Sequence, residues 1–141
     1  YRKTLGLLRD LTGAPSVGVV SEDSERGIIE IARPVGVVGA ITPSTNPVAT
    51  PTNKVMNALK GRNAIILAPS PRGEAVCGEL VELFQQALKK VGAPEALVQK
   101  LPHPINKVDT EALMKMVDLV VATVIDQLRE KTHRAGHAGD D

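Results

Sequence analysis

The chain has 141 residues, of which 43% are hydrophobic and 23% are charged, as in an ordinary globular domain with one core. Its formal net charge is +1, so neither nucleic acid nor an acidic membrane surface is expected as a partner. One Tyr, one Phe and no Trp leave too few aromatic rings for stacking on single-stranded nucleic acid.

The N-terminal segment, residues 1–34, is expected to hold a helix and a strand. Leucines at helical spacing occur between residues 5 and 11, and Gly13 and Pro15 then stop the helix. Isoleucines flank the polar Glu30 within residues 28–31, a pattern that predicts a short strand. The chain does not begin with Met, which favours a fragment or a processed product.

Residues 35–123 alternate between apolar runs and stretches with helical spacing. The apolar runs predict three buried strands, at residues 35–41, 64–67 and 118–122, and a further strand is predicted at residues 97–101. Helices are predicted between these strands, at residues 48–60, 74–91 and 110–116. Strands that alternate with helices pair in parallel through right-handed crossovers. The predicted fold class is therefore α/β, with an open, mainly parallel, Rossmann-like sheet flanked by helices, as in part of a dinucleotide-binding domain.

The strongest predicted helix, residues 74–91, carries an apolar face and a cysteine beside it. The expected face consists of Val76, Leu80, Leu83, Phe84, Ala87, Leu88 and Val91. Cys77 is the only cysteine in the chain, so no internal disulfide can form and a reducing, cytoplasmic location is expected. Because Cys77 adjoins this face, we predict a buried, inert thiol rather than a nucleophile.

The last segment, residues 124–141, differs from the rest of the chain. Residues 124–131 are compatible with one more helix, whereas residues 132–141 lack apolar periodicity and are expected to be disordered. No apolar run reaches the roughly 20 residues that a membrane helix needs. The first residues also lack the apolar region and cleavage site of a secretory signal.

The first polar loop, Thr-Pro-Ser-Thr-Asn-Pro at residues 42–47, leaves the carboxyl end of the strand at 35–41. In an open α/β sheet, ligands bind just beyond such strand ends. The side-chain amide of Asn46 could stabilise a developing oxyanion there. The alternative is that the loop caps the following helix, because Ser, Thr and Asn are favoured at N-caps and Pro at the first helical position. The two roles are compatible.

The second polar loop, Ala-Pro-Ser-Pro-Arg at residues 68–72, leaves the end of the next strand. Its two prolines fix an extended shape that could line a flat cofactor ring or a ribose. Arg72 could meet a phosphate. The alternative is a plain connection from strand to helix in which Arg72 is solvated.

Two common kinds of site are missing from the sequence. No Gly-x-Gly-x-x-Gly fingerprint follows the first strand of the domain, so the usual pyrophosphate turn is absent. His103, His133 and His137 have no spacing that would make them metal ligands with Cys77, and no metal site is expected.

Several strings in register resemble the aldehyde dehydrogenase superfamily. They are Arg-Pro-Val-Gly-Val-Val-Gly-Ala-Ile-Thr-Pro-Ser-Thr-Asn-Pro at residues 33–47 and Lys-Gly-Arg-Asn-Ala-Ile-Ile-Leu-Ala-Pro-Ser-Pro-Arg at residues 60–72. Val-Gly-Ala-Pro-Glu at 91–95 and Asp-Leu-Val-Val-Ala-Thr at 118–123 follow in the expected order. The resemblance covers roughly residues 22–123. It is strongest to the CoA-acylating branch, which includes acetaldehyde and sulfoacetaldehyde dehydrogenases.

The resemblance implies a role for each loop. Asn46 matches the family's Asn, whose amide helps to hold the thiohemiacetal oxyanion, and Thr45 stands where non-acylating relatives have Trp. The residues that match the loop lining the nicotinamide side are Thr42, Pro43, Ser44 and Thr45. The residues that match the loop near the adenosine ribose are Ala68, Pro69, Ser70 and Pro71. Hydrolytic relatives carry a Lys and a Glu in that second loop, and their absence here fits the acylating branch.

The implied activity is the oxidation of a small aldehyde to an acyl-CoA, with NAD or NADP as cofactor and CoA as co-substrate. A homo-oligomer is also implied. In the family a cysteine attacks the aldehyde from a separate domain, and Cys77 does not match it, so the chain is expected to be inactive alone.

A second departure lies at the end of the resemblance. After Thr123 the family continues with Gly-Ser and the pyrophosphate turn, whereas this chain continues with Val124 and Ile125. Nothing from residue 124 onward is expected to match, which suggests a frameshifted, truncated or rearranged reading frame. Two alternatives to an inactive enzyme piece remain. One is a non-catalytic nucleotide-binding or scaffold domain, and the other is a subunit that another chain completes.

Overall fold

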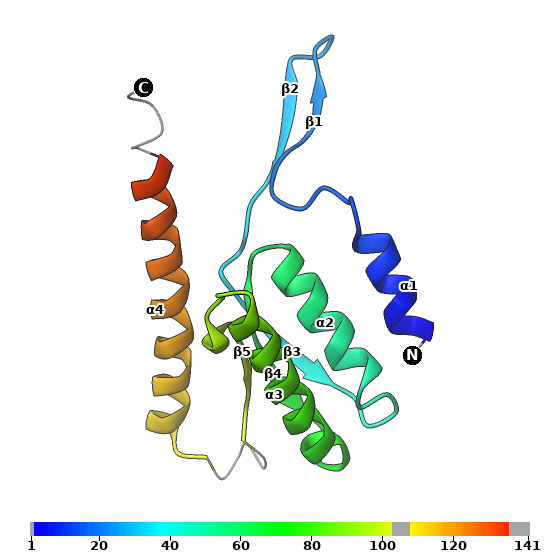
Figure 1. Ribbon diagram of the computed structural model, residues 1–141, viewed down its shortest axis with the longest axis vertical. Coiled ribbons are helices and arrows are strands. Elements are labelled where there is room, and N and C mark those ends of the chain that lie inside the picture. Colours follow the sequence, from blue (N-terminus) through cyan, green and yellow to red (C-terminus); the bar gives the residue numbers. More distant parts are fainter. Residues whose placement is uncertain (1, 103–107, 136–141) are drawn as a thin grey trace.

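The structure, a computed structural model, describes residues 2–102 and 108–135, with the side chains of its last helix described up to residue 122. In chain order its elements are α1 Arg2–Leu11, β1 Gly18–Asp23, β2 Ile28–Ala32, β3 Val37–Thr42, α2 Ala49–Lys60, β4 Ala64–Pro69, η1 Pro71–Gly73, α3 Glu74–Lys90, η2 Glu95–Leu97, β5 Val98–Lys100 and α4 Thr110–Ala135 (Figure 1).

The centre of the molecule is a parallel sheet of three strands in the order β3-β4-β5. Residues of β3 pair in register with β4 from Val37 opposite Ala64 to Thr42 opposite Pro69. Strand β5 pairs with the other side of β4, with Val98 opposite Ile65. The predicted α/β class with a parallel sheet and the strands expected near 35–41, 64–67 and 97–101 are therefore confirmed.

The central strand β4 has apolar side chains on both faces, and helices cover both. On one face Ile65 and Leu67 pack with residues of α2 and α3, among them Val55 and Val81. On the other face Ala64 and Ile66 pack against Val120 and Met116 of α4. The continuous apolar run of β4 follows from this three-layer arrangement, because a strand covered on both sides has no face left for water.

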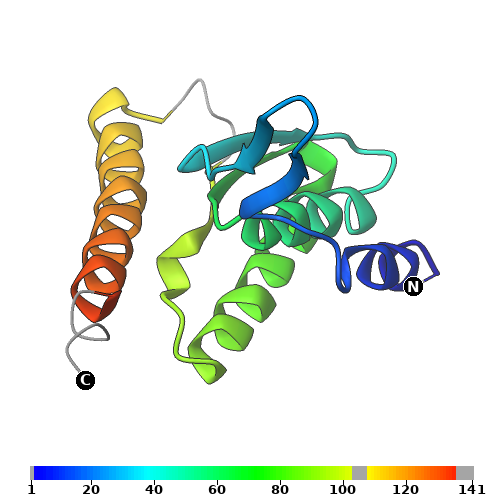
Figure 2. The same ribbon diagram turned by 90° about the horizontal axis from the view of Figure 1, so that it is seen from above.

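A hairpin and a helix precede this domain. Strands β1 and β2 form an antiparallel pair with an irregularity between Val19 and Ser21. The hairpin stands away from the sheet in Figure 1, and α1 lies beside α2 in Figures 1 and 2. The helix near residues 5–11 and the strand near 28–31 were predicted, whereas β1 was not.

The side chain of Asn63 fastens the turn between α2 and β4 to the start of β3. Its Oδ1 accepts hydrogen bonds from the backbone N–H groups of Val35 at 2.7 Å and Gly36 at 2.9 Å. Its Nδ2 donates to the carbonyl of Gly61 at 3.1 Å. One half-buried amide thus satisfies three backbone groups, where the left-handed Arg62 (φ 57°) turns the chain into β4.

Replacement of this amide should cost measurable stability. We expect Asn63→Ala to lower the free energy of unfolding by about 2 kcal/mol or more, because it leaves three backbone groups without their partner. Urea unfolding followed by circular dichroism measures the change. Asn57→Ala is the matched control, since its amide donates only to the Asn53 carbonyl on an exposed helix face. Equal losses in the two variants would contradict the role given to Asn63.

The buried face of α3 differs from the prediction. The helix buries Cys77 and Val81 and packs Phe84 and Leu88 against the same cluster. Of the residues expected on the buried face, Val76, Leu83 and Val91 are exposed, and so is Ala87. Two apolar stripes lie side by side on this helix, and the sheet takes the one that begins at Cys77.

The prediction of a buried strand at residues 118–122 is wrong, because these residues belong to α4. No Gly or Pro interrupts residues 110–135, so nothing breaks a helix there. Met116 and Val120, four residues apart, share the helix face that packs on the sheet. Residues 124–131 are helical, as expected, but within α4 rather than as a separate helix. The helix also includes residues 132–135, against the expected disorder, and residues 136–141 lie outside the described part.

Candidate functional site

The two polar loops leave the sheet side by side. The last residues of β3 and β4, Thr42 and Pro69, are register partners. The backbone N–H of Ser70 donates to the Thr42 carbonyl at 3.1 Å, so the pairing continues into the second loop. Thr42 is buried, whereas residues 43–46 are exposed. The sequence-predicted site residues are therefore brought together at one edge of the sheet, where a ligand of a parallel α/β sheet binds.

Asn46 keeps its side-chain amide free of the helix that follows. The N-cap position of α2 is Val48, which provides no side-chain cap. Asn46 contributes only its backbone carbonyl, which accepts a hydrogen bond from the N–H of Thr50 at 3.2 Å. The capping role considered for the Asn46 side chain is therefore wrong, since the chain enters α2 later than expected. Among the described residues, the exposed amide has no hydrogen-bond partner.

Ser70 lies at the turn into η1 with an extended backbone. Its Oγ is buried and has no hydrogen-bond partner among the described residues. Pro71 opens η1 at a position that needs no N–H donor. Arg72 is exposed. The second loop thus has a rigid backbone, and its unsatisfied Ser70 hydroxyl is buried.

Gly73, at the end of η1, brings the two loops into contact, a role that the sequence did not reveal. A Cβ atom at this position would lie 3.1 Å from the Cβ of Pro47 in the first loop and 3.2 Å from Ser70 Oγ in the second. Only a through-space contact shows this, because the residues are 26 positions apart in the sequence. The pattern Gly61–Arg62–Asn63 at a helix end was a local signal that could have indicated the structural role of Asn63.

Cys77 is fully buried. Nearby, Lys100 forms an ion pair with Glu74, in which the Nζ and Oε1 atoms are 2.8 Å apart. Burial raises the pKa of the Cys77 thiol, and the nearby Lys100 ammonium partly offsets that rise. A buried thiol with a raised pKa is a poor nucleophile. The expectation of a buried cysteine is confirmed.

This burial predicts a dependence of stability on pH. The folded state holds the Cys77 proton more tightly than the unfolded state does. The contribution of this difference to the free energy of unfolding is therefore fully present below the unfolded cysteine pKa. Stability then falls as the pH rises through the folded pKa. We expect the unfolding free energy to decrease more steeply above pH ~9 in the wild type than in Cys77→Ala. Ellman's reagent should react with Cys77 only after unfolding, and fast reaction of the native chain would contradict this burial.

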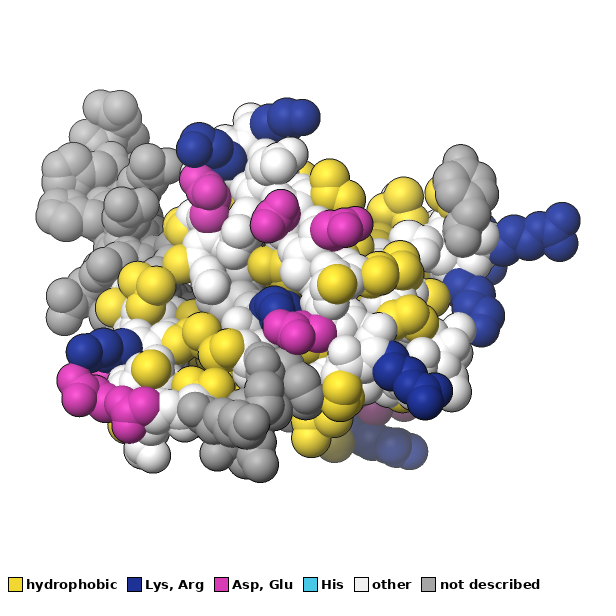
Figure 3. All heavy atoms as spheres, turned by 90° about the horizontal axis from the view of Figure 1, so that it is seen from below, with side chains coloured by type: hydrophobic (Ala, Val, Ile, Leu, Met, Phe, Trp, Pro, Cys, Tyr) yellow, Lys and Arg dark blue, Asp and Glu magenta, His cyan; other side chains and the backbone are white. Residues whose placement is uncertain are grey.

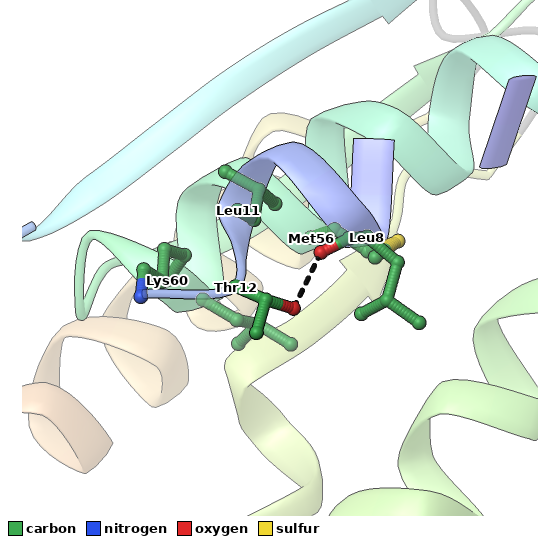
Figure 4. A pocket seen from close by; sticks show the side chains of 6 residues that line it. Leu8, Leu11, Thr12, Met56 and Lys60 are labelled. Carbon is green, nitrogen blue, oxygen red and sulfur yellow. Dashed lines mark hydrogen bonds between the residues drawn. The ribbon is translucent and has the colours of Figure 1, made fainter. Parts of the chain in front are cut away.

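A separate hollow lies between α1 and α2, away from the two loops. It measures about 380 Å³ and is lined by Leu8, Leu11, Thr12, Met56, Leu59 and Lys60 (Figure 4). The Thr12 hydroxyl donates to the Leu8 carbonyl at 2.7 Å, so this polar group is already satisfied. The hollow is an apolar seam where two surface helices meet, without groups that converge on a ligand.

Within the described part of the chain, no cluster of His, Cys, Asp and Glu could hold a metal ion. His103 and His137 lie outside it. A helix that is long and apolar enough to cross a membrane is not found among the described residues either.

The model of the aldehyde dehydrogenase family matches residues 2–125. The match thus also includes α1 and most of β1, which precede the span of the sequence resemblance. A sulfoacetaldehyde dehydrogenase (acylating) of Cupriavidus necator is 58% identical over 123 residues, which make up 87% of this chain and 25% of that relative. One of the same name from Bilophila wadsworthia is 46% identical over 135 residues, 96% of this chain and 29% of that relative. The chain therefore spans about a quarter of the length of the curated relatives it matches.

The longer of these matches corrects one prediction. A match over 96% of the chain must extend past residue 123, so the expectation that nothing from residue 124 onward matches is wrong.

Solved structures show the same fold. An acetylating aldehyde dehydrogenase from Geobacillus thermoglucosidasius superposes with a TM-score of 0.63 at 36% identity, over 67% of this chain and 21% of that one. A glyceraldehyde-3-phosphate dehydrogenase of Methanocaldococcus jannaschii, solved in complex with NADP, gives 0.58 at 29% identity, over 71% and 22%.

Proposed function

The chain belongs to the aldehyde dehydrogenase family, and we propose that it forms part of the cofactor-binding domain of a CoA-acylating enzyme. The observation that carries the proposal is the pair of loops 42–46 and 68–71 at neighbouring strand ends, with the Asn46 amide exposed beside them. Sulfoacetaldehyde is the proposed aldehyde, because relatives with that name are 58% and 46% identical to the chain.

The proposed chemistry gives each loop one task. The Asn46 amide donates a hydrogen bond to the oxyanion that forms when a cysteine thiolate attacks the aldehyde. The loop 42–45 lines the nicotinamide side, and the loop 68–71 lies along the adenosine ribose. NAD or NADP, when bound, would supply the acceptor for the hydride, and CoA would take the acyl group.

The covalent step needs a group that this chain does not supply. Its one cysteine, Cys77, belongs to α3 and is fully buried in the core cluster with Val55 and Val81, so its thiol is not presented at the loops. We therefore propose that the chain binds and orients but does not transfer an acyl group by itself. It spans about a quarter of the length of the curated relatives it matches.

A second candidate function is a binding domain that keeps the fold without the chemistry. The observation that favours it is the closed core around β4, which packs on both faces within these residues. The two candidates differ in cofactor affinity, because an enzyme piece without the family's Gly-Ser turn lacks the donors that hold the pyrophosphate.

Calorimetric titration of the purified chain with NADH separates the two. We expect weak binding, with a dissociation constant on the order of millimolar, because only the two loop walls contribute. ATP serves as the control ligand, since it shares the adenosine and phosphates but lacks the nicotinamide. A dissociation constant on the order of micromolar would favour the self-sufficient binding domain instead.

A further inference from the structure

The first loop at Pro47, the second loop at Ser70 and the turn η1 meet at Gly73, and they leave no room for a further side-chain atom there. Gly73 is buried, and a Cβ atom there would approach both Pro47 Cβ and Ser70 Oγ within 3.2 Å. Contacts that short require the neighbours to move. The backbone of Gly73, with φ −98° and ψ −1°, is one that any residue can adopt. The lack of space, and not the backbone conformation, is therefore what favours glycine here.

The turn that carries Gly73 is fixed to the sheet. The N–H of Gly73 donates to the Ser70 carbonyl at 2.9 Å, and the N–H of Ser70 donates to the Thr42 carbonyl at 3.1 Å. The turn that carries Gly73 is thus attached to the end of β3 through two successive hydrogen bonds. The first loop is fastened less firmly, because residues 43–46 are exposed. A collision at Gly73 would displace Pro47 rather than the turn.

Displacement of Pro47 carries Asn46 with it, since the two residues are joined by one peptide bond and the proline ring restricts φ. The Asn46 side chain has no hydrogen bond of its own among the described residues that would resist this movement. Its position relative to the second loop is therefore determined by where Pro47 rests on Gly73.

We propose that Gly73 is a positioning residue, which sets the place of the Asn46 amide relative to the loop 68–71 by allowing Pro47 to rest on the backbone of η1. The proposal rests on the proposed function for its consequence, because Asn46 is the oxyanion donor there. Displacement of a few tenths of an ångström at such a donor weakens the hydrogen bond that it makes to the developing charge.

The test uses ¹⁵N-labelled chain and reads the side-chain amide signals of Asn46, assigned by their loss in Asn46→Ala. Gly73→Ala should shift these signals in spectra recorded without cofactor. Gly78→Ala is the matched control, because a Cβ there would meet only Lys100 Cε, at an ordinary 3.8 Å. It should leave the Asn46 signals as in the wild type.

The Pro47→Gly background shows whether Gly73 acts through Pro47. This variant removes the Cβ atom that Gly73 faces, so Asn46 should already be displaced in it. The further addition of Gly73→Ala should then change the Asn46 signals little, and this non-additivity is the signature of an action through Pro47. Melting temperatures report any general loss of stability separately. If Gly73→Ala alone does not fold, the comparison is made in the Pro47→Gly chain, with and without Gly73→Ala.

The proposal is overturned if Gly73→Ala leaves the Asn46 signals unchanged, if Gly78→Ala moves them equally, or if the full effect of Gly73→Ala persists beside Pro47→Gly. Failure of the proposed function looks different. In that case NADH would produce no shifts in the wild type, while the coupling of Gly73 to Asn46 would still be visible in spectra without cofactor.

Discussion

The purified chain is expected to form no sulfoacetyl-CoA from sulfoacetaldehyde, CoA and NAD⁺ or NADP⁺. The reason is the absence of an accessible thiolate, since Cys77 is fully buried and its pKa is raised. Loss of a nucleophile typically lowers kcat about a millionfold, which is below detection for reduced-cofactor absorbance at 340 nm. Binding of the aldehyde and correct placement of Asn46 cannot replace the covalent step.

A full-length acylating relative under the same conditions is the positive control for this assay. Cys77→Ala tests whether any trace activity depends on the chain's own sulfur. Turnover by the wild-type chain that disappears in Asn46→Ala would contradict the expected inactivity, because it would show a complete site within these residues.

The chain is also expected to self-associate at high concentration through its β1–β2 hairpin. Five large aliphatic side chains of this hairpin are exposed: Val19, Val20, Ile28, Ile29 and Ile31. An isolated two-stranded hairpin is marginally stable in water, and its edges have unpaired backbone groups. Pairing between the hairpins of two chains would stabilise each hairpin and would provide partners for its unpaired backbone groups. Figure 3 shows that hydrophobic side chains also lie between the charged side chains on another face of the molecule.

Substitution of two hairpin residues tests this surface. Ile29→Lys with Ile31→Lys should weaken association by at least about a hundredfold, because each lysine places a charge in an apolar contact. Val91→Lys is the control, since Val91 is 77% exposed at the end of α3, away from the hairpin. Light scattering across a concentration series reads the mass. A wild-type chain that stays monomeric at the highest concentration would contradict the expected association.

The core of the fold could be predicted from sequence because its signals are local. The apolar runs of β3 and β4 are bounded by Gly, Pro and polar residues, and these boundaries mark a strand wherever the rest of the chain lies. Strand β1 has only Val19 and Val20 before Ser21, Glu22 and Asp23. An exposed hairpin strand has no buried face to impose alternation, so β1 was missed.

The two packing errors have another cause. On α3, the apolar stripes beginning at Val76 and at Cys77 are both helical in period, and only the position of the sheet decides between them. In α4, the run Leu119–Val120–Val121 is as apolar as a buried strand. The helix prevails because Met116 and Val120 meet the sheet together, which is tertiary context that a window of sequence does not contain.

The candidate site was located in part by the same reasoning. Strand ends followed by polar loops predicted where Thr42 and Pro69 would lie, and the structure places them as register partners. The family resemblance, rather than spacing, singled out Asn46. The role of Gly73 could not be predicted from the sequence, because its contact with Pro47 depends on the distance between two loops in the folded chain.

The most direct test of the proposed cofactor role is an NADH titration of the ¹⁵N-labelled wild-type chain, followed by amide chemical shifts. We expect saturable shifts confined to the loops at residues 42–46 and 68–73, with the hairpin at residues 18–32 unchanged. Shifts that map to the hairpin or to the α1–α2 hollow instead, or no shifts at millimolar NADH, would contradict the proposed role.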